Sequence, residues 1–372
     1  MRILLTNVVL TGRTGTEMVV RDLALELKRR GHDPQVYSPA LGAIAEELRS
    51  QGVPVLSDLR RISPPPDVIH GHHHPPTLAA LLRFPDAPAV VVCHDATAWE
   101  DDPLIFPRVL RYVAVDDRCK RRFDDNPRIP PERVRVIFNA VDLSRYKPRS
   151  PLPGRPRRAA IFSNYATERT HTPVVRRACR SLGLPLDILG AGASNPVASP
   201  EEVLPRYDLV FAKARCALEA MAVGAAVVLC DATGLGTMVS SAHVARLRRL
   251  NFGAGTLTRP LDAALIAAEI QKYDPQDARS VSEEIRATAG LSTAITEWVE
   301  LYNDVRREPL GDDRRHAREL AALADYLEKY GFEAGMAWQR TLLRKAFRWP
   351  FLGNRIEKSL KSGWLRRYLR NV

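Results

Sequence analysis

Residues 216–239 read CALEAMAVGAAVVLCDATGLGTMV, a stretch in which helical, turn and strand patterns follow one another without a gap. The small and apolar residues around Glu219 predict a helix that begins there, and a turn at Gly224 ends it. A continuous apolar run then predicts a buried strand, and a glycine loop from Gly234 to Thr237 follows it. Helix, turn and fully apolar strand in this order are typical of an α/β protein whose parallel sheet is covered on both faces.

The same alternation continues on both sides of this stretch. A proline- and arginine-rich segment, KPRSPLPGRPRR at residues 147–158, interrupts it and has the composition of a linker. The strands predicted before the linker are RILLTNVVL, PQVYSP, PVLSD, DVIHGH, AVVVCHD and YVAVD, and those after it are AAIFSN, PLDILGAG, YDLVFA and AAVVLCD. We therefore predict two Rossmann-like, doubly wound domains over residues 1–150 and 151–308, which face a central cleft lined by the carboxyl ends of their strands.

Length and charge agree with this organisation. A chain of 372 residues with 45% hydrophobic content exceeds the size at which a single core stops growing. The formal net charge of +12 indicates either an anionic partner, such as a nucleotide or a lipid headgroup, or simply a generally basic proteome. The charge is not accompanied by a groove-reading helix or a stacking motif, so we expect no nucleic-acid partner.

The five cysteines are isolated and odd in number, which favours a reducing compartment over a disulfide framework or a zinc ribbon. The opening run MRILLTNVVL is apolar but too short for a membrane span, and we interpret it as a buried first strand. These features predict a cytoplasmic protein.

From Pro309 onward the pattern becomes helical, and we predict a basic helical extension over residues 309–372. Its last part, residues 338–372, interleaves Trp and Phe with many Lys and Arg. This composition is typical of a segment on an anionic membrane surface, and equally of a helix that packs back on its own protein. The first interpretation would place the protein peripherally at the inner face of the membrane.

Three motifs in order resemble the retaining GT-B glycosyltransferases of family four (glycosyl transferases group 1), over roughly residues 1–305. Residues 10–39, LTGRTGTEMVVRDLALELKRRGHDPQVYSP, place a glycine-bearing loop between a strand and a helix. Residues 139–148, NAVDLSRYKP, are similar to the family's Asn-Gly-Val-Asp, aromatic and proline. Residues 218–228, LEAMAVGAAVV, are similar to its Leu-Glu-Ala-Met-Ala-x-Gly-x-Pro-Val-Val.

The resemblance implies a hexosyltransferase of EC 2.4 type that moves a sugar from a UDP- or GDP-sugar with retention of anomeric configuration. It implies no metal and no further cofactor. The amino-terminal domain would take the acceptor, a saccharide, lipid-linked or other cell-envelope or polysaccharide molecule, and the carboxyl-terminal domain would take the donor.

The same resemblance suggests which residues contact the donor. Glu219 would accept hydrogen bonds from ribose hydroxyls, because a carboxylate offers several acceptor sites. Glycines in the loops would let backbone amides approach the diphosphate. The expected loop positions are Gly12, Gly15, Ser163, Asn164, Gly190, Gly234, Gly236, Thr237 and Met238.

Two departures from the family pattern affect this site. The family carries a first glutamate eight positions before the residue that matches Glu219, and Phe211 stands there. The usual Arg/Lys pair for the diphosphate is also missing after AAIF. Because the leaving diphosphate gains negative charge, we expect cations beside it, and we predict that Lys213 and Arg215 take that role. A solvated loop is the alternative.

Residues 67–77, DVIHGHHHPPT, contain four histidines. Side chains alternate along a strand, so His70 and His72 share one face, and a metal pair is conceivable if His94 or Asp95 supplies another ligand. The resemblance implies no metal, and the other interpretation is that the imidazoles shape the acceptor pocket or bond to backbone carbonyls. His94 is the expected catalytic residue, since many relatives place a histidine there beside the donor sugar; a core histidine bonded to Asp95 is the alternative.

Two functions remain in competition at this point. The first is an active glycosyltransferase. The second is a catalytically degenerate pseudo-glycosyltransferase that keeps the nucleotide-sugar pocket but lost catalysis with the carboxylate at position 211. An epimerase or phosphorylase of the same fold is less supported.

Overall fold

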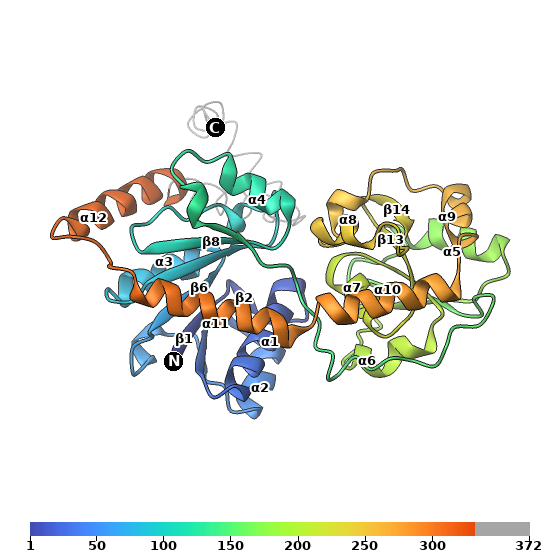
Figure 1. Ribbon diagram of the computed structural model, residues 1–372, viewed down its shortest axis with the longest axis horizontal. Helices are drawn as coiled ribbons and strands as arrows, with labels where there is room; N and C mark the ends of the chain where they lie inside the picture. Colours follow the sequence, from blue (N-terminus) through green and yellow to red (C-terminus); the bar gives the residue numbers. More distant parts are fainter. Residues whose placement is uncertain (332–372) are drawn as a thin grey trace, which may run out of the picture. The chain divides into compact units, whose positions relative to one another are not determined.

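The structure is a computed structural model that describes residues 1–331. The chain divides into two compact units, residues 1–310 and residues 311–372. The larger unit contains two separate large β-sheets with helices around each, one on each side of the predicted linker in the sequence (Figure 1).

The first sheet has seven strands in the order β5-β3-β1-β6-β7-β8-β9, and every neighbouring pair is parallel. Since all strands point the same way, their carboxyl ends meet at one edge and their amino ends at the other. The strands are β1 Arg2–Thr6, β3 Asp33–Tyr37, β5 Val55–Leu56, β6 Val68–His72, β7 Ala89–Cys93, β8 Val109–Ala114 and β9 Val134–Val136, and a separate small pair is formed by β2 Val9–Leu10 and β4 Ala40–Leu41.

Helices cover this sheet. They are α1 Gly15–Arg29, α2 Ala43–Ser50, α3 His74–Arg83 and α4 Asp117–Asp124, with 3-10 turns η1 Leu59–Arg61, η2 Trp99–Asp101 and η3 Pro131–Arg133. α1 starts where it does because Thr14 and Glu17 form a capping box, and it ends with Lys28 and Arg29, whose charges suit a helix carboxyl end.

The second sheet has the order β11-β10-β12-β13-β14, and only β14 is antiparallel to its neighbour. Its strands are β10 Ala159–Phe162, β11 Leu186–Leu189, β12 Leu209–Ala212, β13 Ala226–Asp231 and β14 Gly234–Met238. The helices around it are α5 Thr172–Ser181, α6 Pro200–Val203, α7 Ala214–Ala222, α8 Val244–Arg249, α9 Ala263–Ile270 and α10 Pro275–Thr288, with 3-10 turns η4 Ala191–Ala193, η5 Leu204–Arg206 and η6 Ala254–Thr256.

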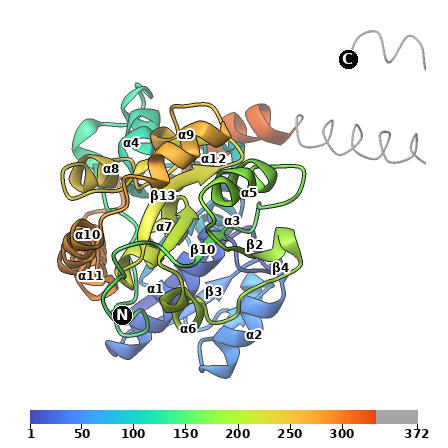
Figure 2. The ribbon, with the colours of Figure 1, turned by 90° about the vertical axis from the view of Figure 1, so that its right-hand side faces the viewer.

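Both faces of the second sheet are buried, which explains its continuous apolar strands. Ile161, Phe211 and Val228 project to one face and pack with residues of α5 and α9, two helices that lie side by side (Figure 2). Val210 and Val227 project to the opposite face and pack with residues of α7 and α10.

α11, Leu291–Arg307, follows the second sheet in sequence but packs against α1, β6 and β7 of the first (Figure 1). Its buried Trp298 and Tyr302 contact His70. A helix that the sequence assigned to the range 151–308 thus completes the core of the first sheet.

In the smaller unit, the structure describes α12, Arg315–Tyr326, and a π-helical turn, Leu327–Gly331. None of the helices within residues 1–331 is both long and apolar enough to cross a membrane. The aromatic and basic segment 338–372, with its predicted membrane contact, lies outside the described residues.

The predicted fold class is confirmed. Two parallel Rossmann-like sheets are present, and each strand predicted on the two sides of the linker is found. One expectation was wrong: residues 234–238 form strand β14, not a loop, because they pair with β13.

Candidate functional site

The carboxyl edge of the first sheet carries a cluster of histidines. His70 and His72 share a face of β6, as predicted, and their ring centroids lie 4.5 Å apart. The Nδ1 atom of His72 is 2.6 Å from Nε2 of His94, and Nδ1 of His70 is 2.6 Å from the hydroxyl of Tyr302. The His94 ring therefore pairs with His72. The alternative interpretation, in which His94 bonds to Asp95, was wrong.

Burial keeps these imidazoles neutral. It lowers the pKa of His70 and of His94 to about 3, helped by the charge of a neighbouring histidine, and lowers that of His72 well below its ordinary value. Among the described residues, the Nε2 atoms of His70 and His72 are buried without a hydrogen-bond partner. Neutral rings with a nitrogen to spare can donate to or accept from a hydroxyl group.

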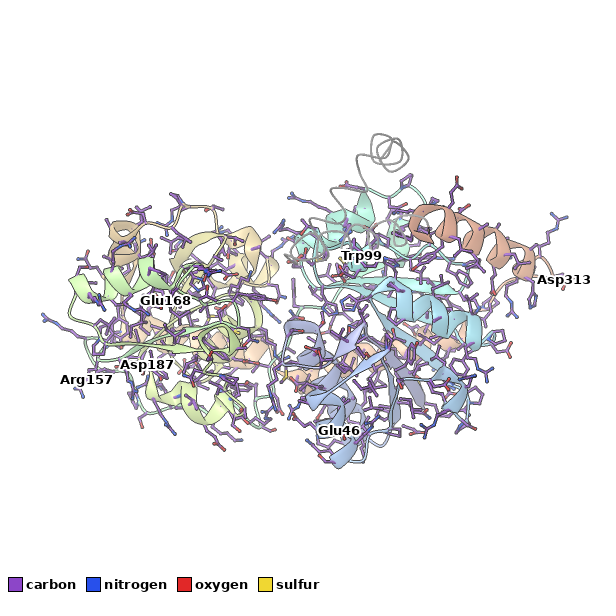
Figure 3. The ribbon with its side chains drawn as sticks, turned by 180° about the vertical axis from the view of Figure 1, so that it is seen from behind. Glu46, Trp99, Arg157, Glu168, Asp187 and Asp313 are labelled. Carbon is purple, nitrogen blue, oxygen red and sulfur yellow. The ribbon has the colours of Figure 1, made fainter. Side chains whose placement is uncertain are left out.

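The turn after β7 is held in place by side chains. Asp101 accepts hydrogen bonds from the backbone amides of His94 and Asp95, at 3.0 and 3.1 Å. Arg122 donates to the carbonyl of Ala98, and the carbonyl of Trp99 lies 3.1 Å from Nε2 of His74. Trp99 itself leaves 53% of its surface exposed (Figure 3).

A buried charge network joins α1 to α7. Arg215 donates from Nε to Glu219 at 2.7 Å and from its other end to Asp22. Arg21 also binds Asp22, at 2.6 Å, and reaches Glu47 at 2.7 Å. Glu219 was expected at a helix start, but it lies inside α7, one turn after Arg215.

The protonation of this network follows from burial and charge. Burial raises the pKa of Asp22, but the charges of Arg215 and Arg21 outweigh it and leave the pKa below its ordinary value. Burial also raises the pKa of Glu219, and the charge of Asp22 adds to the effect, so that Arg215 only partly offsets the rise. Arg215 is thus held by two carboxylates in this structure, and its role beside a diphosphate stays a prediction.

Lys213 is also paired. Its Nζ forms an ion pair with Asp231, which is buried at the end of β13. The Nδ1 atom of His171 lies 3.8 Å from the same carboxylate. Tyr165 follows β10, is 61% exposed, and has its ring centroid 6.0 Å from Nζ of Lys213.

The loop with Gly12 and Gly15 does not leave all its amides free, as the sequence suggested. Glu17 is buried and accepts hydrogen bonds from the amides of Thr11, Gly12 and Thr14, at 2.6, 2.8 and 3.0 Å. The carboxylate of the chain itself therefore takes the place that an anionic ligand was expected to occupy.

The residues of β14 are similarly engaged. Gly236 is packed so closely that an added Cβ would lie 2.7 Å from Cβ of Leu229. The amide of Met238 donates to Glu269 at 2.8 Å, and the hydroxyl of Thr237 lies 3.2 Å from the same carboxylate. Gly234 pairs with Asp231 of β13, so these four positions are structural in this conformation.

The turns after β10 and β11 do meet. Asn164 accepts a hydrogen bond from the amide of Ala191 at 3.1 Å and donates to the carbonyl of Arg13 at 2.9 Å. Gly190 has φ +142°, and an added Cβ would collide with the carbonyl of Ser163. Ser163, Asn164 and Gly190 therefore lie together at the carboxyl edge of the second sheet, and their contact with a donor stays a prediction.

The position of Phe211 in the fold accounts for an apolar residue where the family pattern has a glutamate. It lies within β12, fully buried, and packs in the cluster that includes α5 and α9. A carboxylate at this position of the chain would be inside the core, and Phe211 itself is fully buried there.

A cavity of about 40 Å³ connects the two clusters. Its wall includes His70, His72 and His94 from the first sheet, with Asp22 and Arg215 from the charge network. This volume holds water but not a hexose. No group of three His, Cys, Asp or Glu side chains arranged to hold a metal ion occurs within residues 1–331.

Sequence reasoning missed four acidic and aromatic members of these clusters. Asp22 and Asp101 are recognisable only by their burial, although Asp22 lies between the apolar residues of an amphipathic helix. Asp231 is the last residue of a predicted buried strand, and a carboxylate at the carboxyl end of such a strand is a signal for a site residue. Tyr302 is contributed by α11, and no local signal relates it to His70.

Comparisons with known proteins give a partial family match and a shared fold. Residues 13–145 match the sequence model of Glycosyltransferase Family 4. No curated protein matches the chain. The structure is similar to a glycosyltransferase from Rickettsia africae ESF-5, with 14% identity, a TM-score of 0.60, and coverage of 83% of this chain and 99% of that one.

Two further solved structures share the fold. HepE from Anabaena in complex with UDP-glucose is 16% identical with a TM-score of 0.59, over 82% of this chain and 100% of that one. Sucrose-phosphate synthase from Thermosynechococcus elongatus is 12% identical with a TM-score of 0.56, over 82% and 98%. The chain thus has the GT-B fold of these proteins, and its residues 13–145 match the sequence model of Glycosyltransferase Family 4.

Proposed function

We propose that this protein transfers a hexose from a UDP- or GDP-sugar to a cell-envelope or polysaccharide acceptor, with retention and without a metal ion. The observation that carries the proposal is the meeting of the histidine cluster with Arg215 and Asp22 around one cavity, in a chain with the GT-B fold. The family match over residues 13–145 and the UDP-glucose complex of HepE support a nucleotide-sugar donor.

In this proposal, the cavity widens when the donor binds, because its volume of about 40 Å³ is too small for a hexose. The neutral imidazoles then hold the reacting sugar. His94 donates a hydrogen bond to a sugar hydroxyl, and its partnership with His72 fixes the ring orientation. A retaining transfer in which the departing phosphate takes the acceptor proton needs no dedicated general base, and this suits a site whose histidines are buried and neutral.

Donor binding requires a change of partners in the charge network. Glu219 can accept ribose hydroxyls only when Arg215 releases it, and Arg215 can then turn to the diphosphate. Lys213, paired with Asp231 and 29% exposed, is the second cation available to the diphosphate.

The test uses purified full-length protein with a panel of UDP- and GDP-sugars and candidate acceptors. Acceptor-dependent release of UDP or GDP is expected, with the product configuration read by NMR and with activity unchanged by EDTA. Glu219→Gln should raise KM for the donor, while Glu46→Gln, an exposed residue of α2 (Figure 3), should not. Donor binding without release under every condition would reject the proposal.

That last outcome would favour the alternative, a nucleotide-sugar-binding pseudo-glycosyltransferase. Its specific support is the neutralisation of Arg215 and Lys213 by carboxylates of the chain, together with Phe211 in the core. Calorimetry with UDP and GDP distinguishes it from loss of the site, because a pseudo-enzyme still binds the nucleotide.

A further inference from the structure

A second cavity lies at the amino-terminal edge of the first sheet, opposite the histidine cluster. It has a volume of about 650 Å³. Its lining includes Arg2 at the start of β1, Asp67 just before β6 and Pro88 just before β7. Because the strands are parallel, this edge is the one away from His72 and His94, and the glycosyltransferase proposal makes no use of it.

A buried arginine fixes the part of the pocket wall that residues 83–88 form. The guanidinium of Arg108, 1% exposed, donates to the carbonyls of Phe84 and Ala87 at 2.8 and 2.9 Å. These bonds fix the turn after α3. On the floor, the amide of Asp67 donates to the carbonyl of Arg2 at 2.9 Å, and the Asp67 carboxylate accepts from the amide of Arg2 at 2.8 Å. The pocket is therefore preorganised.

The charges around the pocket are unevenly matched. Asp67 is paired with Arg2 at 2.5 Å, and Glu308 is paired with Arg111 outside the pocket. Arg60 is paired with Asp58 at 2.9 Å. Asp86, the third carboxylate of the wall, is also engaged in an interaction within the chain.

Two other arginines in the wall are different. Arg83 has its guanidinium 5.7 Å from the ring centroid of Phe84, and Arg306 lies at the end of α11. Across the described part of the chain, neither forms an ion pair with a carboxylate. The charge of Arg306 helps to lower the pKa of Asp67, but Asp67 is ion-paired with Arg2 and not with Arg306. Two cations that face one pocket from two different helices and form no ion pair favour an anionic ligand.

The remaining lining is apolar. Ile62, Phe84 and Pro66 are buried residues of the lining, and Pro65 and Pro85 are exposed ones. A ligand that fits would combine an anionic group with an apolar part, because proline and phenylalanine rings offer no hydrogen-bond donor. Arginine binds both carboxylates and phosphates through two parallel N–H groups, but a phosphate monoester has three terminal oxygens and can therefore pair with two guanidinium groups at once.

We propose that this pocket is a binding site for a phosphate ester with an attached apolar group, held by Arg83 and Arg306. The ligand is either the headgroup end of an anionic lipid or a free phosphorylated molecule; the phosphate is common to both. The site is independent of the donor site, and its existence does not depend on glycosyl transfer.

The test is calorimetric titration of the full-length protein with dihexanoyl phosphatidic acid and, separately, with inorganic phosphate, both in saturating UDP so that a donor site does not report. Wild type should bind at least one of them. R83Q/R306Q should weaken that binding at least about tenfold, the loss expected for two charge-assisted hydrogen bonds. R180Q/R246Q removes two exposed charges on α5 and α8 and should bind like wild type.

The two ligands identify the source. Tighter binding of the short-chain lipid indicates a lipid headgroup, and sedimentation with phosphatidic acid vesicles should then also weaken in R83Q/R306Q. Equal binding of inorganic phosphate indicates a free phosphorylated ligand. Absence of binding of both by wild type, or equal losses in R83Q/R306Q and R180Q/R246Q, overturns the proposal. Urea unfolding of each variant verifies that the fold is intact.

Discussion

Replacement of Arg215 by methionine tests the buried charge network most directly. Arg215 is the only cation paired with Glu219 within residues 1–331, at 2.7 Å, whereas Asp22 keeps a second partner in Arg21 at 2.6 Å. The substitution therefore leaves the buried carboxylate of Glu219 without a cationic partner, although a hydrogen bond with Tyr146 remains. Breaking a buried pair by removing one partner costs about 3–5 kcal/mol, and we expect a loss in that range at pH 8.

The loss should depend on pH. Without Arg215, the folded-state pKa of Glu219, already above its ordinary value, rises further. A carboxyl group with a raised folded-state pKa binds its proton more tightly in the folded protein, so the stability of the variant falls as pH rises through that pKa. The difference from wild type should thus be smaller at pH 5 than at pH 8.

The measurement is urea unfolding followed by circular dichroism at both pH values. Glu219→Gln in the Arg215→Met background should recover most of the loss, because it removes the unpaired charge. Arg29→Met, which removes an exposed partner of Glu26, should leave the stability nearly unchanged. A loss of less than about 1 kcal/mol at pH 8, or an identical loss at both pH values, would refute the reasoning.

Three further predictions concern other parts of the fold. Phe211→Glu should lower the free energy of unfolding by more than about 3 kcal/mol without increasing transferase activity above that of wild type, whereas Phe211→Leu should cost far less; urea unfolding and nucleotide release measure both effects. Burial raises the pKa of Asp101 to about 7, so stability should fall between pH 4 and pH 7, and Asp101→Asn should flatten that slope in thermal unfolding at a series of pH values. Gly190→Ala should reduce the melting temperature, since φ is +142° and the added Cβ meets the Ser163 carbonyl; Gly15→Ala, in open space, is the control.

The secondary structure was largely predictable because burial on both faces imposes a simple pattern. Val227 and Val228 face opposite sides of the second sheet and are both buried, so the strand reads as an unbroken apolar run. The ring contact between His70 and His72 was equally predictable, because side chains alternate along a strand and residues two positions apart lie on the same face.

The glycine segments were harder. Gly234 and Gly236 suit a phosphate loop by residue type, but they equally suit a strand in close contact with Leu229, and only the pairing with β13 distinguishes the two. Gly12 suits an anion site, yet the anion bound there is Glu17, five residues further along the same chain.

The sequence alone determined the α/β architecture, the linker and the family resemblance, because these depend on periodicity and on short motifs that are local in the chain. The tertiary structure decided the state of the site. Arg215 meets Asp22 across 193 positions, and His70 meets Tyr302 across 232. No local pattern encodes such partners, and in a buried region the partner determines whether a charge is available to a ligand or already neutralised.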